Sequence, residues 1–135
     1  MVAKGENGPQ GMEQLRSPNS VEATYARLRS AVAGRGLTIF AEIDFAHDAA
    51  AVGLSMRPAR LLVFGNPRAG TPLMVESPTL ALDLPLKILV WQAPDETTRV
   101  GYNTPEYLGA RHGLRDDLLQ NLQAVKVLAE GAAKP

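Results

Sequence analysis

A run of apolar residues, 61–64, leads directly into a segment that holds two glycines, Gly65 and Gly70. A continuous apolar run of this length, bounded by turn residues, predicts a buried strand in the interior of a sheet. Glycine adopts positive φ without steric cost, so the chain can turn sharply after the strand. Thr71 then stands as a helix N-cap with proline behind it, the pattern that begins a helix. The chain is therefore expected to fold around a strand, a tight turn and short helical segments over residues 72–82.

The rest of the chain carries further strand and helix signals. Apolar residues at every second position over 37–44 predict a strand with one face fully committed to the core. A cap at residues 18–20, followed by apolar residues at helical spacing, predicts an amphipathic helix that ends near Gly34. Strands are expected at 12–16, 37–44, 61–64, 86–92 and 98–103, and helices at 20–34, 48–54, 72–82, 105–113 and 116–131.

The order of these elements predicts the fold class. One strand and one helix are followed by four strands with short helical insertions and then by C-terminal helices, unlike the regular alternation of a doubly wound sheet. Strands 86–92 and 98–103 are joined by a loop of hairpin length. We expect a single α+β domain over residues 11–131, with a curved, mostly antiparallel sheet of about five strands and helices packed on one face. Residues 1–10 lack apolar periodicity and are expected to form a flexible N-terminal tail.

Composition argues against several classes of partner. Lysine and arginine number 14, as do aspartate and glutamate, so no net field attracts nucleic acid or an anionic membrane. Aromatic residues make up only 5%, which leaves few side chains for base stacking. No apolar run reaches the roughly 18 residues of a transmembrane helix, and the first ten residues lack the apolar stretch of a secretory signal. Because cysteine is absent, we expect a cytoplasmic protein without disulfides or thiolate-bound metals.

Several separate segments resemble one family of bacterial proteins. They are residues 17–24, 36–44, 64–67, 70–74, 84–87 and 111–113, within a similarity that extends over about residues 12–127. In these segments the chain resembles the domain-of-unknown-function 302 family. The resemblance implies an α+β fold like that of the TATA-binding protein, with helices on one face of a curved antiparallel sheet and often a paired subunit. It implies no reaction, and fold analogy alone implies no DNA binding.

Segment 65–71 has two interpretations. Its glycines have the spacing of a phosphate-binding P-loop, but Thr71 stands where that motif requires lysine, and Pro72 removes a backbone donor. The plainer interpretation is a tight turn before a capped helix. The alternative is an anion site, in which the helix N-terminus, the Thr71 hydroxyl and Arg68 together hold a carboxylate or phosphate.

Two further side chains stand out by their surroundings. Lys87 lies within an apolar strand, so its ammonium group must reach water or pair with a carboxylate such as Asp44 or Asp83. It is either half of a structural pair or a pocket lysine that meets an acidic ligand. His112 shares a helix face with Leu108 and points inward if Leu108 is in the core. It is either a hydrogen-bonded core or cap residue or a group that binds a ligand or transfers a proton.

The sequence holds no complete catalytic or cofactor motif. A metal site would require the two histidines, His47 and His112, to meet Asp44, Asp48 and Glu42, and we expect no metal. No Gly-x-Ser-x-Gly segment is present, so a serine hydrolase is not indicated. No cofactor is expected.

We therefore expect a non-catalytic, homodimeric binding module for a small molecule or anion, in a pocket between the sheet and segment 65–71. The alternative is a structural or protein-interaction homodimer without a ligand. A third interpretation is a small enzyme that uses Asp44, Lys87 or His112 as acid or base, which requires two of them within hydrogen-bond reach in one cleft. The candidate ligand-binding residues are Asn66, Arg68, Thr71, Lys87, His112 and Asp44.

Overall fold

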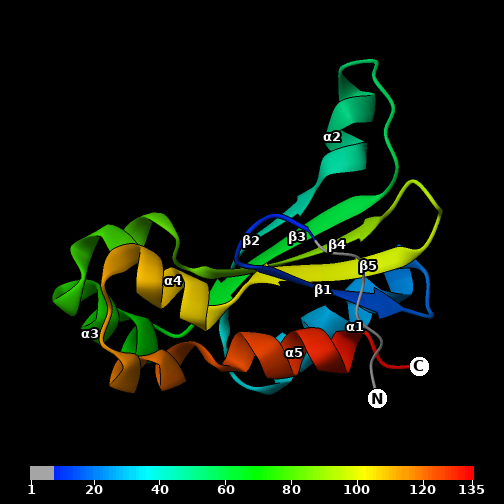
Figure 1. Ribbon diagram of the computed structural model, residues 1–135. Helices are drawn as coiled ribbons and strands as arrows, with labels where there is room; N and C mark the ends of the chain where they lie inside the picture. Colours follow the sequence, from blue (N-terminus) through cyan, green and yellow to red (C-terminus); the bar gives the residue numbers. More distant parts are fainter. Residues whose placement is uncertain (1–7) are drawn as a thin grey trace.

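The fold is built on a five-stranded antiparallel sheet (Figure 1). The computed structural model describes residues 8–135, so residues 1–7 of the predicted flexible tail lie outside the described residues. The strands stand in the order β1-β5-β4-β3-β2. Their bounds are β1 Met12–Ser17, β2 Thr38–Asp44, β3 Ala59–Gly65, β4 Leu86–Gln92 and β5 Thr98–Asn103. The predicted α+β class is confirmed.

Helices cover one face of the sheet and gather at one end of it. α1 Val21–Gly34 and α5 Ala124–Ala132 lie side by side beneath the sheet and contact its inner strands (Figure 1). A group of two α-helices and two 3-10 helices lies at the end of the sheet: α3 Pro67–Glu76, η1 Pro78–Leu82, α4 Pro105–His112 and η2 Asp116–Leu122. On the other side, α2 Phe45–Ala51 and the turn after it form a projecting arm, residues 45–58.

The core lies between the sheet and the two helices beneath it. α1 begins where the Ser20 hydroxyl accepts a hydrogen bond from the backbone N–H of Ala23, at 3.1 Å. Its apolar residues recur at helical spacing and face the sheet, where alternate residues of β3 and β4 point toward them. The members of this core without exposed surface include Leu28, Val32, Leu62, Phe64, Ile88 and Val90.

The prediction that β2 commits one face fully to the core is wrong. None of its residues is buried, and the Phe40 side chain is 50% exposed. β2 pairs only with β3, and its register shifts between Ile39 and Ala41, as in a β-bulge. An edge strand has a neighbour on one side only, so its alternating pattern does not guarantee burial.

Two helices begin earlier than predicted. α3 starts at Pro67, because the Asn66 Oδ1 accepts from the Arg68 N–H at 3.0 Å and proline fits the first helical position. Pro72 therefore lies inside the helix, and Gly70 belongs to the helix rather than to a turn. α2 likewise starts at residue 45, because Asp44 caps it.

The predicted C-terminal helix over 116–131 is two elements. η2 packs against α3 and α4, whereas α5 packs against α1 and the sheet, so the two segments serve different parts of the core. Gly131 does not end the helix, which runs to Ala132.

Phe64 and Phe40 test this division between an inner strand and an edge strand. Phe64→Ala is expected to lower the free energy of unfolding by about 3–5 kcal/mol, because a fully buried ring leaves a cavity. Phe40→Ala, the matched control on the edge strand, is expected to cost less than about 1 kcal/mol. Urea denaturation measures both, and equal losses would contradict the assignment of the core to β3.

Candidate functional site

A cavity of about 270 Å³ lies between the end of the sheet and the helices α3 and η2. We call it the apolar cavity. Most of its wall is apolar and comes from segments far apart in the sequence. Its apolar lining includes Leu37, Phe40, Phe64, Met74, Leu84 and Leu122. Gly70 also lines it, and a Cβ added there would meet only the Leu84 Cδ1, at 3.7 Å, so this wall is loosely packed.

Three polar side chains line the same cavity: Asn66, Thr71 and Asn121. The Asn66 Oδ1 accepts from the Arg68 N–H at the start of α3, and the Asn121 Nδ2 donates to the Ala69 carbonyl at 3.0 Å. Within residues 8–135, the structure shows no partner for the other amide atoms of these asparagines or for the Thr71 hydroxyl. One donor, one acceptor and one hydroxyl are therefore available to a ligand.

The structure does not bring the six candidate residues together at one cavity. Asn66 and Thr71 line the apolar cavity, whereas Arg68 lies in the first turn of α3 with an exposed side chain and does not. Lys87 follows Leu86 on β4, and successive residues of a strand point to opposite faces. Leu86 lines the apolar cavity and Lys87 is not part of its lining.

Lys87 lines a second, smaller hollow of about 130 Å³, which we call the polar cavity. Its lining is Leu82, Asp83, Leu86, Lys87, Asn103 and Leu108, so Leu86 contributes to both cavities. The Lys87 Nζ donates to the carbonyl oxygens of Pro85 at 2.9 Å and Asp83 at 3.3 Å. Partial burial lowers the pKa of Lys87, and the nearby charge of Asp83 opposes this shift only in part.

His112 contacts the carboxylate of Asp83. The His112 Nε2 lies 2.5 Å from the Asp83 Oδ2, and the Arg111 Nη1 lies 2.7 Å from the same oxygen. Burial alone would raise the pKa of Asp83, but the hydrogen bond from His112 and the charge of Arg111 outweigh it, so the pKa lies below its usual value. Asp83, which the sequence indicated only as a partner for lysine, is the anionic centre of this cluster.

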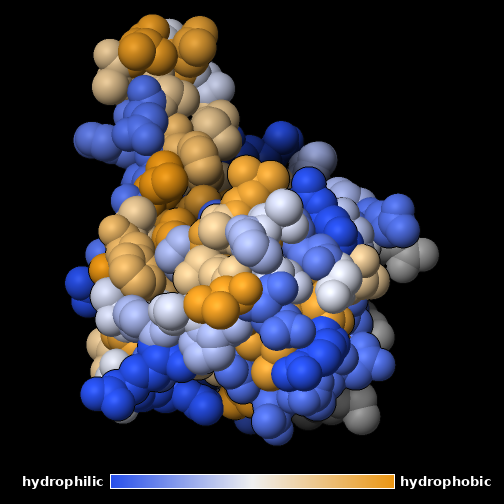
Figure 2. Space-filling model, turned by 90° about the vertical axis from the view of Figure 1, so that its left-hand side faces the viewer, coloured by the Kyte–Doolittle hydropathy of each residue, from blue (hydrophilic) through white to orange (hydrophobic). Residues whose placement is uncertain are grey.

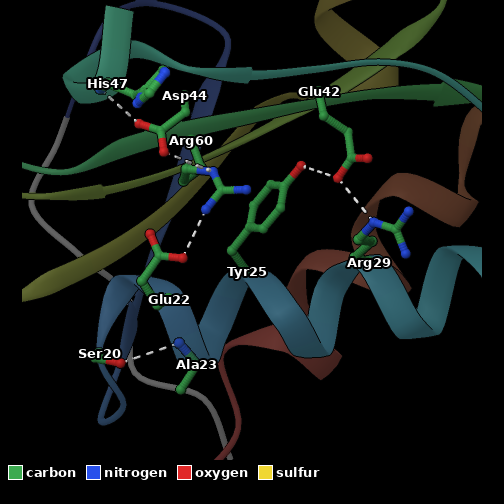
Figure 3. A network of polar contacts seen from close by, with 9 residues as sticks. All are labelled: Ser20, Glu22, Ala23, Tyr25, Arg29, Glu42, Asp44, His47 and Arg60. Atoms are coloured by element: carbon green, nitrogen blue, oxygen red, sulfur yellow. Dashed lines mark hydrogen bonds and ion pairs between the residues drawn. The ribbon is translucent and has the colours of Figure 1, made fainter. Parts of the chain in front are cut away.

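Asp44 lies at the other end of the sheet, within a structural network (Figure 3). One of its oxygens caps α2 by accepting from the His47 N–H, and the other lies 3.8 Å from the Arg60 Nε. The Arg60 Nη1 donates to Glu22 of α1 at 2.7 Å, and its guanidinium lies 4.1 Å from the centre of the Tyr25 ring. These contacts join α1 to β2 and β3, so we assign Asp44 a structural role.

The same network extends along β2 (Figure 3). The Tyr25 hydroxyl donates to the Glu42 Oε1 at 2.7 Å, and the Arg29 Nε donates to the same oxygen at 3.0 Å. Burial and the acceptor Glu42 raise the pKa of Tyr25, while the hydrogen bond from Tyr25 lowers the pKa of Glu42. Glu42 is thus held as a carboxylate between helix and edge strand.

Among the described residues, no two of Asp44, Lys87 and His112 form a hydrogen bond with each other. The structure therefore gives no support to an acid–base pair drawn from these three. No group of three or more metal-binding side chains is found within residues 8–135. None of the helices in that range combines the length and apolar character needed to cross a membrane.

Sequence reasoning missed Asn121 and the apolar lining. Asn121 lies 52 residues from its contact, Ala69, in a segment with no binding motif, so only the tertiary structure reveals its position.

The antiparallel sheet with helices on one face belongs to a known class of domain. The chain matches the family described as domain of unknown function DUF302 over residues 13–129, and it belongs to this family. The crystal structure of an uncharacterized conserved DUF302 protein from Bacillus stearothermophilus has the same fold, with a TM-score of 0.74 and 17% identity over 93% of this chain and 97% of that one.

Two curated relatives are longer proteins. The chain is 32% identical over 123 residues to the fluoride-specific ion channel FluC 1 of Brucella suis biovar 1, a match that covers 90% of this chain and 46% of the relative. The fluoride-specific ion channel FluC 2 of Brucella melitensis biotype 1 is also 32% identical, with 44% of its length covered. The chain thus spans less than half the length of these relatives.

The lowered pKa of Asp83 predicts how stability changes with pH. A carboxyl group whose pKa is lower in the folded state stabilises the fold above its unfolded value of about 3.9, and this contribution is lost as the pH falls through the folded value. Asp83→Asn is therefore expected to be less stable than wild type at pH 7, and the two should converge as the pH falls below about 4.

Urea denaturation midpoints between pH 7 and about 2.5 measure this convergence. Asp48→Asn is the matched control, because Asp48 has no ion pair within residues 8–135, and its curve should run parallel to that of wild type. A constant gap between wild type and Asp83→Asn at every pH would contradict the prediction.

Proposed function

We propose that this domain is a binding module for a small, mainly apolar ligand held in the apolar cavity. The observation that supports this proposal is the cavity itself, a hollow of about 270 Å³ with an apolar wall and three polar side chains. Ligand sites in proteins are typically concave and apolar, with a few polar groups that orient the ligand. The volume lies just below the usual range for drug-sized molecules, which favours a small metabolite.

The lining also indicates the chemistry of the ligand. No charged side chain from the described residues lines the apolar cavity, and placing an unpaired charge against apolar surface costs several kcal/mol. This argues against the anion that the sequence suggested, because neither Arg68 nor Lys87 is part of its lining. We propose a neutral ligand with an apolar body and a group such as an amide or alcohol, which meets Asn66, Thr71 and Asn121.

A thermal-shift screen against neutral metabolites tests this proposal. A ligand present at about 100 times its dissociation constant should stabilise the fold by about 2.7 kcal/mol. Ala69→Phe is expected to abolish the shift, because a phenyl group from α3 fills the cavity. Ala26→Phe, an exposed position on α1, is the matched control and should leave the shift unchanged. A shift that persists in Ala69→Phe would place the ligand elsewhere.

The arm favours a second candidate function, the formation of a homodimer. Figure 2 shows apolar side chains gathered at its tip. Val52 is 73% exposed and Leu54 is 67% exposed, and α2 itself has no buried residue. Exposed apolar groups gathered in one place often mark an interaction site. We propose that the arm packs against a second copy of the chain.

The relatives bear on this second candidate. A segment like this chain makes up less than half of proteins named as fluoride-specific ion channels. In those proteins the matching segment is one part of a longer chain. A domain that lies beside other parts of a protein needs a surface for contact with them, and the arm offers such a surface. If the arm does not join two copies, the channel part of such relatives is the next partner to test.

Leu54→Asp tests the homodimer. Sedimentation velocity of the wild-type chain is expected to show a dimer. The variant should be a monomer, because the dimer contact would bury the introduced carboxylate without an opposite charge to pair with it. Val127→Asp, on the exposed face of α5, is the control and should remain dimeric. A wild-type chain that is monomeric at all concentrations would contradict the arm as a dimer contact.

A further inference from the structure

A hydroxyl, an imidazole and a carboxylate are linked in order at the end of the sheet opposite the arm. The Thr79 Oγ1 lies 2.9 Å from the His112 Nδ1, and the His112 Nε2 lies 2.5 Å from the Asp83 Oδ2. We call these three residues the relay. His112 comes from the last turn of α4, and Thr79 lies in η1. None of the three lines the apolar cavity, so the relay is separate from the proposed ligand site.

The hydrogen bonds assign a role to each member. The lowered pKa of Asp83 keeps it ionised, and a carboxylate only accepts, so the imidazole proton lies on the His112 Nε2. In the neutral imidazole the Nδ1 atom then carries the lone pair, and the Thr79 hydroxyl donates to it. The His112 side chain is only 6% exposed, and Arg111 also holds Asp83 at 2.7 Å, so the imidazole is fixed in position. This is the order of nucleophile, base and orienting group found in acyl-transfer enzymes.

The surroundings offer space for a substrate. Side chains at positions i and i+3 of a 3-10 helix eclipse each other, so Thr79 and Leu82 share one face of η1. Leu82 and Asp83 line the polar cavity of about 130 Å³, so one member of the relay is part of its wall, and the Thr79 residue is exposed. Leu86 and Leu108 give this cavity an apolar wall, and Lys87 and Asn103 give it hydrogen-bond donors. It suits a short acyl group with a carbonyl oxygen.

We propose that the relay catalyses acyl transfer from small acyl esters, with Thr79 as the nucleophile. The Thr79 Oγ attacks the ester carbonyl carbon while its proton moves to the His112 Nδ1. The tetrahedral intermediate collapses, the bond to the leaving oxygen breaks, and that oxygen takes the proton as an alcohol. Water then attacks the acyl-threonine ester with His112 as base, which releases the acid and restores the Thr79 hydroxyl. The balance is ester plus water to acid plus alcohol, without a redox partner.

A purely structural tether would use the same contacts, since the relay also joins α4 to η1. The two roles differ in one observable, because only a nucleophile acquires an acyl group at the Thr79 oxygen. Such an ester is cleaved by hydroxylamine, whereas an acyl group on the Lys87 amine is not. The chemical identity of the modified atom therefore separates the roles.

The experiment treats the full chain with p-nitrophenyl acetate, quenches it with acid and maps the peptides by mass spectrometry. An acetyl group on Thr79 that hydroxylamine removes is expected. Thr79→Val should remove it, and Thr79→Ser should retain it. His112→Gln should slow its formation by about 100-fold or more, the usual contribution of a general base.

Thr38→Val, an exposed threonine of β2, is the control and should acylate at Thr79 like wild type. Circular dichroism establishes that each variant is folded. If Thr79→Val does not fold, the peptide map of the wild-type chain still tests whether Thr79 is acylated. A wild-type chain without acetyl on Thr79, or with acetyl on lysines only, overturns the proposal. So does a folded His112→Gln that acylates Thr79 at the wild-type rate.

Discussion

The burial of alternate side chains of β3 and β4 against α1 is the interaction on which the rest of the structure depends. Leu62, Phe64, Ile88 and Val90 have no exposed surface. Each such side chain contributes about 1.5–3 kcal/mol when it leaves water, so these strands are the most firmly held part of the sheet. At the ends of the same strands, Gly65 lines the apolar cavity and Leu86 lines both cavities. The core thus fixes the position of the strand ends that line the two cavities.

Much of this fold could be predicted from local patterns. The apolar run ending at Phe64 and the hairpin of β4 and β5 are signals that depend on near neighbours in the chain, and tertiary packing did not alter them. β2 was different. Alternation of apolar and polar residues indicates a strand with one apolar face, but it does not tell whether that strand has a neighbouring strand on both sides or lies at the edge of the sheet. The start of α3 was different again, since Asn66 and Thr71 both precede a proline and both resemble caps. Only packing decides between two equal local signals.

The site was less predictable than the fold, for a related reason. Asn66 and Thr71 were singled out because each directly follows a glycine of segment 65–71, and the structure places both in the wall of the apolar cavity without a charged neighbour in its lining. Lys87 and Leu86 are adjacent in the sequence, but only Leu86 reaches the apolar cavity, while both line the polar cavity. Thr79 and His112 lie 33 residues apart, and no motif announces their contact. Side chains that are far apart in the sequence and meet only in the folded structure cannot be recognised from their spacing along the chain.

Leu86 forms part of the wall of both hollows, on the apolar side and on the polar side. A guest that displaces this side chain from one hollow changes the room available in the other. Thermodynamic reciprocity then requires that each occupant alter the affinity of the other by the same factor. Two ligands bound in these hollows would therefore be coupled through a single leucine side chain, without any movement of the helices beneath the sheet.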